Sequence, residues 1–357
     1  MVLPRFHPLR IADIRRETAD CVSLAFDVPE ALRPDYAFVP GQYLTLSAVI
    51  EGEEVRRSYS LSSGLDDGEL RVAIKRLPGG AFSGWAHETL RAGDTLSVMT
   101  PDGRFGVPVE PASARLLVAI AAGSGITPVM AILKSVLDRE PHSRFILFYG
   151  NRDSDSVIFR DQLGDLKDRY LARLSVFHLL SREQQDLPAL NGRLDGATVQ
   201  GLMRAMVPLS AVDHVFVCGP QPMIAALPGA LAALDLPRAR IHVERFTPGE
   251  GGKLRPVAVP PQAEPAAIAT VICDGRRAEI PVAAGEAIID AAIRAGRALP
   301  YSCKGGMCCT CRAKLLDGSV AMAVNYSLEP WETAAGYVLT CQARPLTDRV
   351  VLDYDQV

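Results

Sequence analysis

The feature that most constrains this chain is a cysteine-rich loop near its C-terminal end. Four residues separate Cys303 from Cys308, two separate Cys308 from Cys311, and Cys341 follows much later. This C-x4-C-x2-C…C spacing is typical of a plant-type [2Fe–2S] cluster, in which four thiolates surround two irons and two sulfides. A tight loop supplies three thiolates, and the distant cysteine supplies the fourth. The sequence therefore predicts four metal ligands: Cys303, Cys308, Cys311 and Cys341.

The loop also contains residues that are not ligands in this interpretation. Gly305 and Gly306 let the backbone pass close to the sulfides and donate N–H groups to them. Cys309 is a fifth cysteine in the same loop. If it replaced Cys308, only one residue would separate it from Cys311, so we interpret Cys309 as a bystander.

A zinc site and a disulfide framework are the alternatives for such a loop. Structural zinc sites usually contain paired C-x2-C units or histidines, whereas Cys341 stands alone with no histidine nearby. Disulfide frameworks are typical of small secreted proteins, and this chain has 357 residues. If the loop binds zinc, its function would be that of a zinc-bound or redox-sensing interaction module.

The length of the chain allows two or three domains, each with its own core. Residues 1–110 contain short alternating strands separated by turns, which predicts a small closed antiparallel β-barrel. In residues 111–247 strands alternate with helices, which predicts an α/β domain with a parallel sheet. Residues 248–267 are rich in proline and glycine and predict a semi-rigid linker. Residues 268–357 hold two strands, a helix over 285–295 and the cysteine loop.

Charge and hydropathy exclude several classes of partner. The chain has 38 basic and 41 acidic residues, a net charge of −3, which gives no indication of nucleic acid or of an anionic membrane surface. The N-terminal residues lack the apolar core of a signal peptide, and no apolar run is long enough to span a bilayer. We therefore expect a cytoplasmic protein, since cluster thiols stay reduced in that compartment.

One predicted barrel strand carries the sequence Arg57-Ser58-Tyr59-Ser60. Arg57 can neutralise a phosphate, Tyr59 can lie against a flat ring, and Ser60 can hydrogen-bond to a ring nitrogen. An alternating strand with a buried tyrosine explains the motif equally well when it is taken alone. Its position ahead of an α/β domain is what favours a binding role.

A second barrel segment combines Lys75 with the turn Gly79–Ser83. The turn offers a flexible backbone, N–H donors and a hydroxyl, which are the parts of a pyrophosphate-binding loop. The residues predicted to contribute are Lys75, Gly80, Phe82 and Ser83.

The α/β domain opens with Gly123-Ser124-Gly125-Ile126-Thr127-Pro128. A dinucleotide fingerprint has glycine or alanine at the last position, where this chain has Pro128. Proline suits the first position of a helix, which predicts a helix over 128–138 with Thr127 as its N-cap. The two glycines would let a pyrophosphate approach the helix N-terminus. A plain strand-to-helix turn is the alternative for this motif alone.

Together these motifs resemble the ferredoxin–NADP reductase superfamily. In that family the R-x-Y-S strand binds FAD, the G-x-G-x-x-P turn binds the nicotinamide dinucleotide, and a C-G-P motif lies near the nicotinamide. Residues 218–220 match the C-G-P motif, and Glu244 and Phe246 end a segment that resembles the one beside the flavin. Ser181 and Arg182 look like the segment that binds the 2′-phosphate of NADP, because a guanidinium can bind phosphate through two hydrogen bonds. A solvated loop charge is the alternative for Arg182.

The resemblance implies two sets of site residues. Those implied in the transfer step are Tyr59, Ser60, Cys218 and Glu244. Those implied in cofactor binding are Arg57, Tyr59, Ser60, Lys75, Gly80, Phe82, Ser83, Gly123, Gly125, Thr127, Pro128, Ser181, Arg182, Gly219, Pro220 and Phe246.

The C-terminal cluster domain narrows the resemblance to the reductase subunits of multicomponent oxygenases, and within these to the ring-1,2-phenylacetyl-CoA epoxidase type. This implies a multidomain fold: an FAD-binding barrel, an NADP-binding α/β domain and an α+β β-grasp ferredoxin domain. It also implies a relay from NADPH through FAD and the [2Fe–2S] cluster to a di-iron oxygenase. No Glu-x-x-His pair occurs in the sequence, so the oxygenase is expected to be a partner. Another aromatic or steroid hydroxylase, of the Rieske or di-iron type, is the alternative partner.

Overall fold

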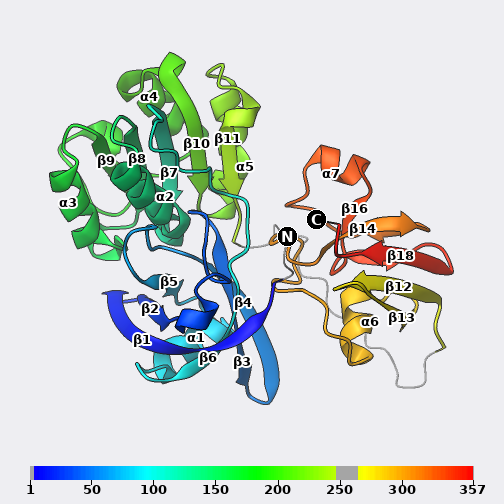
Figure 1. Ribbon diagram of the computed structural model, residues 1–357. Coiled ribbons are helices and arrows are strands. Elements are labelled where there is room, and N and C mark those ends of the chain that lie inside the picture. Colours follow the sequence, from blue (N-terminus) through cyan, green and yellow to red (C-terminus); the bar gives the residue numbers. More distant parts are fainter. Residues whose placement is uncertain (1–3, 247–263, 357) are drawn as a thin grey trace. The chain divides into compact units, whose positions relative to one another are not determined.

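The computed structural model describes residues 4–246 and 264–356 (Figure 1). The described chain forms two compact units, one of residues 6–246 and the other of residues 264–356 with residues 4 and 5. Most of the predicted linker, residues 248–267, lies outside the described residues, and its last residue already begins a strand. Within 4–246 and 264–356, no helix has the length and apolar character needed to cross a membrane.

The first part of the larger unit is a six-stranded antiparallel sheet with the strand order β4-β3-β6-β1-β2-β5 (Figure 1, blue to cyan). Just beyond β4, Leu61 pairs with Val72 of β5, and the Ser62 N–H donates to the Arg71 carbonyl at 2.9 Å. The two edges of the sheet therefore meet, and the predicted barrel is closed at this end. The strands are β1 (Phe6–Thr18), β2 (Cys21–Asp27), β3 (Tyr43–Ile50), β4 (Glu53–Ser60), β5 (Leu70–Lys75) and β6 (Thr95–Met99).

The second part of this unit is a five-stranded parallel sheet with the order β11-β10-β7-β8-β9. Its strands are β7 (Leu116–Ala122), β8 (Arg144–Asn151), β9 (Leu174–Leu180), β10 (Val212–Cys218) and β11 (Ile241–Glu244). Four helices cover the sheet, and they are α2 (Ile126–Arg139), α3 (Arg160–Arg169), α4 (Gly196–Met206) and α5 (Gln221–Ala232).

The apolar run in β7 follows from this layering. Leu117 and Ala119 pack into the core formed with α2 and α3, whereas Val118 and Ile120 pack into the core formed with α4 and α5. Both faces of the strand are buried, so both sets of alternating residues are apolar.

The smaller unit is a mixed five-stranded sheet with the order β13-β12-β18-β14-β16 and a separate pair, β15 and β17. Strands β12 and β18 are parallel, and the other neighbours in the large sheet are antiparallel. The elements are β12 (Ala267–Cys273), β13 (Arg276–Val282), α6 (Ile288–Arg294), β14 (Arg312–Asp317), β15 (Val320–Met322), α7 (Pro330–Ala334), β16 (Tyr337–Leu339), β17 (Ala343–Pro345) and β18 (Arg349–Asp353). The predicted fold class of barrel, parallel α/β domain and small α+β domain is confirmed.

The prediction that Thr127 caps the helix after the glycine turn is wrong. Residues 123–125 already form a turn of 3-10 helix, and α2 follows without a break from Ile126. Thr127 therefore lies inside the first turn, where its hydroxyl donates to the Ser124 carbonyl at 3.0 Å. Pro128 becomes the third helical residue, a position where its missing N–H would have no partner inside the helix.

Two further boundaries differ from those predicted. The loop after Lys75 ends at Gly80, and helix α1 (Ala81–Thr89) begins there, so Phe82 and Ser83 belong to a helix rather than to a flexible turn. Helix α6 begins three residues after Gly285, because Gly285 adopts a φ of +72° in the preceding turn.

Candidate active site and cluster loop

A cavity of about 840 Å³ lies at the carboxyl ends of the parallel strands. The segments that follow β7, β8, β9 and β10 all line it, as the general rule for ligand sites in open α/β sheets requires. It brings together five of the predicted cofactor-binding residues: Lys75, Gly123, Ser181, Arg182 and Pro220. The sequence groups Lys75 with Gly80 and Ser83, whereas in the structure its ammonium group lies beside the glycine turn of the α/β domain.

The two glycines of that turn, Gly123 and Gly125, have different surroundings. Gly123 has a φ of +54°, and the only atom near a Cβ added there is the Lys75 ammonium nitrogen at 3.8 Å, so this glycine borders open space in the cavity. A Cβ on Gly125 would lie 2.1 Å from the Cys218 carbonyl oxygen. Gly125 is therefore needed to pack the start of α2 against the end of β10. The open space at Gly123 fits a ligand that approaches the backbone closely.

The cavity lining carries more positive than negative charge. Asp195 is occupied as the N-cap of α4, because it accepts from the Thr198 N–H at 2.8 Å. Asp20 lies 3.1 Å from an Arg152 nitrogen and 3.6 Å from the Lys75 ammonium. The cationic residues of the lining are Lys75, Arg76, Arg152, Arg182 and Arg193. This excess of cations suits a ligand with several phosphate groups.

Sequence reasoning missed Asn151, Arg152 and Arg193, which also line the cavity. Asn151 ends β8 and Arg152 follows it. Ligand-binding residues collect at the carboxyl ends of parallel strands, so the apolar strand pattern that precedes these two residues is the signal that could have found them. Arg193 lies in a loop ahead of α4 and had no comparable signal.

The barrel side of the site is built around Tyr59 on β4. Its ring lies 5.7 Å from the ring of Phe82, which is almost completely buried at the start of α1. Arg57, two residues earlier on the same strand, is exposed, and its Nη1 donates to the Arg56 carbonyl at 2.7 Å. The strand therefore carries the Tyr59 ring, which packs against Phe82, and the Arg57 guanidinium, which is exposed to solvent.

Ser83 uses its hydroxyl within the loop that precedes α1. The hydroxyl accepts from the Leu77 N–H at 3.1 Å and donates to the Gly80 carbonyl at 3.3 Å. A Cβ on Gly80 would lie 2.5 Å from this oxygen, so glycine at that position permits the bond. Ser83 thus fixes the shape of the loop that follows Lys75.

The barrel and the parallel sheet meet at Ser60, Cys218 and Glu244. The Ser60 hydroxyl donates to Glu244 Oε2 at 3.3 Å, and Glu244 pairs with Cys218 across β11 and β10. Protein surrounds Glu244 on most sides, although its side chain keeps some exposure, and this burial raises its pKa to about 8. Burial also raises the pKa of the Cys218 thiol, with a smaller contribution from Glu244. Near neutral pH the three groups are therefore uncharged, and uncharged groups suit a flat ring better than a phosphate. Phe246 follows and is 37% exposed.

The four predicted cluster ligands form two pairs. All eight cysteines lie in the described residues, and none is in a disulfide. A hydrogen bond from the Cys308 thiol, with backbone N–H groups, lowers the pKa of Cys303. In the second pair, a hydrogen bond from the Cys311 thiol lowers the pKa of Cys341. Cys303 and Cys308 are half-buried, and Cys311 and Cys341 are buried.

This pairing fits a two-iron cluster. Each iron of such a cluster takes two protein thiolates, whereas a structural zinc ion needs four ligands around one centre. In the described ranges, no three His, Cys, Asp or Glu side chains are arranged to hold one metal ion. The Gly305 N–H lies 3.3 Å from the Cys303 sulfur, and the Gln342 amide lies 3.5 Å from the Cys341 sulfur. Such donors are typical of cluster-binding loops.

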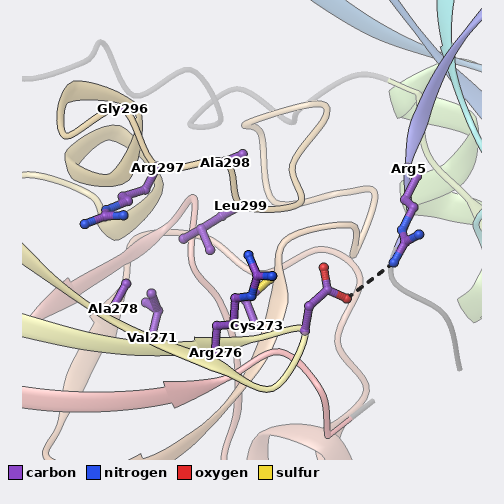
Figure 2. Close-up of a pocket in the computed structure, with 10 residues that line it drawn as sticks. Arg5, Val271, Cys273, Arg276, Ala278, Gly296, Arg297, Ala298 and Leu299 are labelled. Atoms are coloured by element: carbon purple, nitrogen blue, oxygen red, sulfur yellow. Dashed lines mark ion pairs between the residues drawn. The ribbon is translucent and has the colours of Figure 1, made fainter.

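The smaller unit has a second cavity, of about 680 Å³ (Figure 2). Val271, Ala278 and Leu299 provide its apolar lining, and Arg276 and Arg297 are exposed beside it. None of the predicted site residues lines this cavity.

Three family models match consecutive parts of the chain. They are the oxidoreductase FAD-binding domain at residues 8–106, the oxidoreductase NAD-binding domain at residues 119–228 and the 2Fe-2S iron-sulfur cluster binding domain at residues 271–346. The predicted FAD, nicotinamide nucleotide and [2Fe–2S] cluster are thereby confirmed as the cofactor classes. The last match favours the cluster over the zinc alternative.

Several known proteins are similar over the whole chain. The chain is 48% identical to one of the subunits of 1,2-phenylacetyl-CoA epoxidase from Escherichia coli (strain K12), over 98% of each chain. It is 36% identical to the ferredoxin reductase component of 3-ketosteroid-9-alpha-monooxygenase from Rhodococcus rhodochrous, over 97% of this chain and 96% of that protein. The solved structure of phthalate dioxygenase reductase shares its fold, with a TM-score of 0.58 and 23% identity over 98% of each chain. The chain is therefore an electron-transfer oxidoreductase, and it belongs to the family of oxygenase reductase components that combine an FAD-binding, an NAD-binding and a 2Fe-2S domain.

Proposed function

We propose that this chain is the NADPH-dependent reductase component of a phenylacetyl-CoA epoxidase. The observation that carries this proposal is the 48% identity, along 98% of both chains, with the epoxidase subunit of Escherichia coli. When bound, FAD takes up two electrons as hydride from NADPH and releases them singly to the [2Fe–2S] cluster, which supplies them to the oxygenase. The residues of this chain bind and orient the cofactors for that exchange.

The residues of the larger cavity hold the nicotinamide dinucleotide in this proposal. Gly123, Gly125, Thr127 and Pro128 form the turn and helix start against which the pyrophosphate lies, with the Lys75 ammonium beside it. Gly219 and Pro220 continue the wall after β10. The N-terminal end of α2 favours negative charge at this place.

Ser181 and Arg182 select NADPH over NADH in this proposal. The Ser181 N–H donates to the Asn151 carbonyl at 3.1 Å, and the Arg182 N–H donates to the Arg152 carbonyl at 2.7 Å. These bonds fix the backbone of the segment while the Arg182 side chain stays exposed. Its guanidinium can therefore bind the 2′-phosphate through two hydrogen bonds.

The flavin lies against β4 in this proposal. Tyr59, supported by Phe82, covers the ring, Ser60 hydrogen-bonds to it, and Arg57 neutralises a phosphate. Gly80 and Ser83 keep the neighbouring loop in shape. Cys218, Glu244 and Phe246 approach the place where the nicotinamide meets the flavin, and the protonated Glu244 carboxyl offers a hydrogen-bond donor there.

Reconstitution tests the proposal. The purified protein, loaded with FAD and the cluster, is mixed with the oxygenase subunits of a phenylacetyl-CoA epoxidase, and NADPH oxidation and phenylacetyl-CoA are followed in the presence and absence of oxygen. We expect oxygen-dependent loss of phenylacetyl-CoA coupled to NADPH oxidation. If NADPH bleaches the flavin and cluster bands but no phenylacetyl-CoA is consumed, the epoxidase is not the partner.

A steroid monooxygenase is the second candidate partner. It is favoured by the 36% identity with the Rhodococcus rhodochrous reductase component over 97% of this chain. The same assay with the oxygenase component of a 3-ketosteroid monooxygenase separates the two candidates, because only the matching oxygenase should couple NADPH oxidation to substrate loss.

A further inference from the structure

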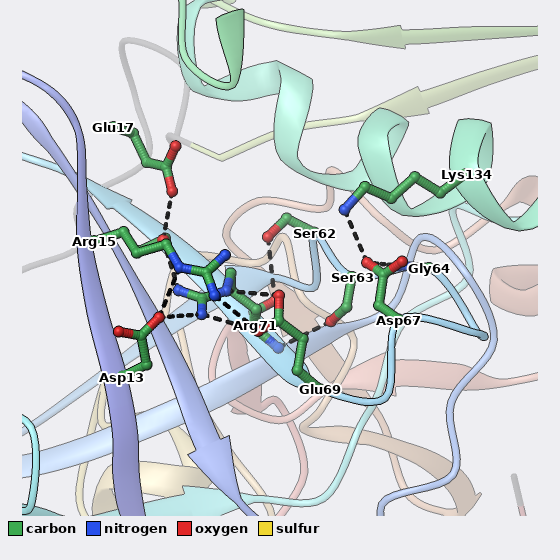
Figure 3. A network of polar contacts seen from close by, with 11 residues as sticks. Asp13, Arg15, Glu17, Ser62, Ser63, Gly64, Asp67, Glu69, Arg71 and Lys134 are labelled. Carbon is green, nitrogen blue, oxygen red and sulfur yellow. Dashed lines mark hydrogen bonds and ion pairs between the residues drawn. The ribbon is translucent and has the colours of Figure 1, made fainter. Parts of the chain in front are cut away.

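The loop between β4 and β5 is held firmly on the barrel side (Figure 3). The backbone N–H of Arg71 donates to the Ser63 hydroxyl at 2.9 Å, and the Ser62 hydroxyl donates to the Arg71 carbonyl at 3.3 Å. Glu69, at the end of the loop, accepts two hydrogen bonds from the Arg71 guanidinium, at 2.8 and 2.9 Å. Both ends of the loop are thus fixed to the same residue of β5.

Arg71 is itself anchored in the barrel. Its side chain is 3% exposed. The guanidinium donates to Asp13 of β1 at 2.6 Å (Figure 3). It also donates to the Ser23 hydroxyl of β2 at 2.9 Å. A buried guanidinium whose hydrogen bonds go to two strands and to the loop itself has little freedom to move. The loop is therefore attached to a residue whose own position in the barrel is fixed.

The middle of the same loop is bound to helix α2 of the α/β domain. The Lys134 ammonium lies 2.8 Å from Asp67 Oδ2, which also accepts from the Gly64 N–H at 2.9 Å (Figure 3). The side chains of this ion pair are partly buried, with 13% of Lys134 and 22% of Asp67 exposed. The Leu65 N–H donates to the Ser135 hydroxyl at 3.1 Å.

A second ion pair extends this attachment along the helix. Arg139 donates to both carboxylate oxygens of Asp66, at 2.8 and 2.7 Å. The loop also approaches α2 closely at Gly64, because a Cβ added to Gly64 would lie 2.8 Å from the Cβ of Lys134. The loop thus contacts more than one turn of α2.

The two elements joined in this way carry the two halves of the proposed active site. The loop follows directly after Tyr59 and Ser60, and α2 begins directly after the glycine turn 123–125. We infer that Asp67 and Lys134 are positioning residues, which hold the flavin strand and the dinucleotide-binding helix at the separation that hydride transfer requires. This inference rests on the proposed function, which places the flavin on β4 and the dinucleotide at the start of α2.

Rapid-mixing kinetics of the full-length, cofactor-loaded protein test the inference. Asp67→Asn and Lys134→Gln each remove the ion pair and keep the size of the side chain. Flavin bleaching is followed anaerobically with NADPH and with NADPH deuterated at the transferred position. We expect the bleaching rate at saturating NADPH to fall by about 10- to 100-fold, the range that a misplacement of about 1 Å can produce. The deuterium isotope effect should rise, while the NADPH concentration for half-maximal rate stays unchanged, because neither residue lines the dinucleotide cavity.

The matched control is Asp27→Asn, which breaks the exposed ion pair between Arg10 and Asp27 at 2.6 Å within the barrel. It should bleach at the rate of the unaltered protein. Unaltered rates and isotope effects in both ion-pair variants would overturn the inference, as would a lowered unfolding temperature with no kinetic change. If Asp67→Asn does not fold, Lys134→Gln decides. Failure of the unaltered protein to be reduced by NADPH would count against the proposed function instead.

Discussion

Ser60 and Glu244 are 184 positions apart in the sequence, yet the Ser60 hydroxyl lies 3.3 Å from Glu244 Oε2. Ser60 is the last residue of β4 in the barrel, and Glu244 is the last residue of β11 at the edge of the parallel sheet. The contact joins the two sheets where flavin and nicotinamide are proposed to meet. It is a long hydrogen bond, so burial rather than this bond determines the protonation of the carboxyl group.

The pH dependence of stability should reveal this carboxyl. Burial raises the pKa of Glu244 from its ordinary value of 4.5 to about 8. Between these pH values the folded chain keeps a proton that the unfolded chain has released, so the contribution of Glu244 to stability is full below pH 4.5 and is lost as the pH rises to about 8. Glu244→Gln cannot ionise, so its unfolding temperature should fall less than that of the unaltered protein between those limits.

Thermal unfolding of the flavin-free protein at several pH values checks this expectation. The difference between the two proteins should amount to a few kcal/mol at most, since the carboxyl keeps some solvent exposure. The exposed Glu279, on β13, offers a control, because Glu279→Gln makes the same substitution at another carboxyl and leaves Glu244 unaltered. Parallel curves for Glu244→Gln and the unaltered protein would mean that Glu244 is ionised at neutral pH.

The cysteine loop allows a comparison of neighbouring residues. Cys308 is paired with Cys303, whereas Cys309 has a left-handed backbone, with a φ of +56°, and packs against the core of its domain. Cys308→Ser should therefore lose the cluster, and Cys309→Ser should keep it. Iron and acid-labile sulfide per chain, with the visible absorption of the cluster, measure the result. Equal iron contents in the two variants would remove Cys308 from the ligand set.

What the sequence could predict was mostly local. The four cysteines are recognisable because the geometry of a cluster imposes a fixed spacing on three of them. The apolar run over 116–122 predicts a buried strand, and the structure explains it by helices on both faces. These features depend on a few consecutive residues, so no knowledge of the tertiary structure is needed.

Other features depend on contacts between distant segments. Arg193 joins the cavity through a loop that no pattern distinguishes. Lys75 looks like part of the barrel loop by sequence, but its ammonium lies beside Gly123. The start of α2 moves to Ile126 because the preceding turn is already helical. The ion pair between Asp67 and Lys134 joins two domains, and no pattern in the sequence predicts it.

Arg182 should decide between the two nicotinamide nucleotides. Arg182→Ala removes a guanidinium that can form two charged hydrogen bonds with the 2′-phosphate, so the KM for NADPH should rise by about tenfold or more while that for NADH changes little. Steady-state reduction of an artificial electron acceptor gives both constants. Arg204, exposed on α4 and outside the cavity, is the matched control. An unchanged ratio of the two KM values in Arg182→Ala would assign the 2′-phosphate to another cation, for which Arg152 and Arg193 are the candidates.

The two glycines of the turn before α2 should respond differently to alanine. In Gly125→Ala the new Cβ would lie 2.1 Å from the Cys218 carbonyl oxygen, so the start of α2 or the end of β10 has to move. Gly123→Ala meets no protein atom closer than 3.8 Å, and its penalty is the left-handed backbone, about 1 kcal/mol or a fall of roughly 2–4 °C in unfolding temperature.

Thermal unfolding and the yield of folded protein distinguish the two variants. Gly125→Ala should unfold at a much lower temperature or fail to fold, because backbone atoms cannot give way as flexible side chains do. Gly123→Ala should fold and retain flavin, but it should bind NADP⁺ more weakly, since its methyl group occupies space beside Lys75 that is proposed for the pyrophosphate. If Gly123→Ala binds NADP⁺ as tightly as the unaltered protein, the pyrophosphate does not lie against that glycine.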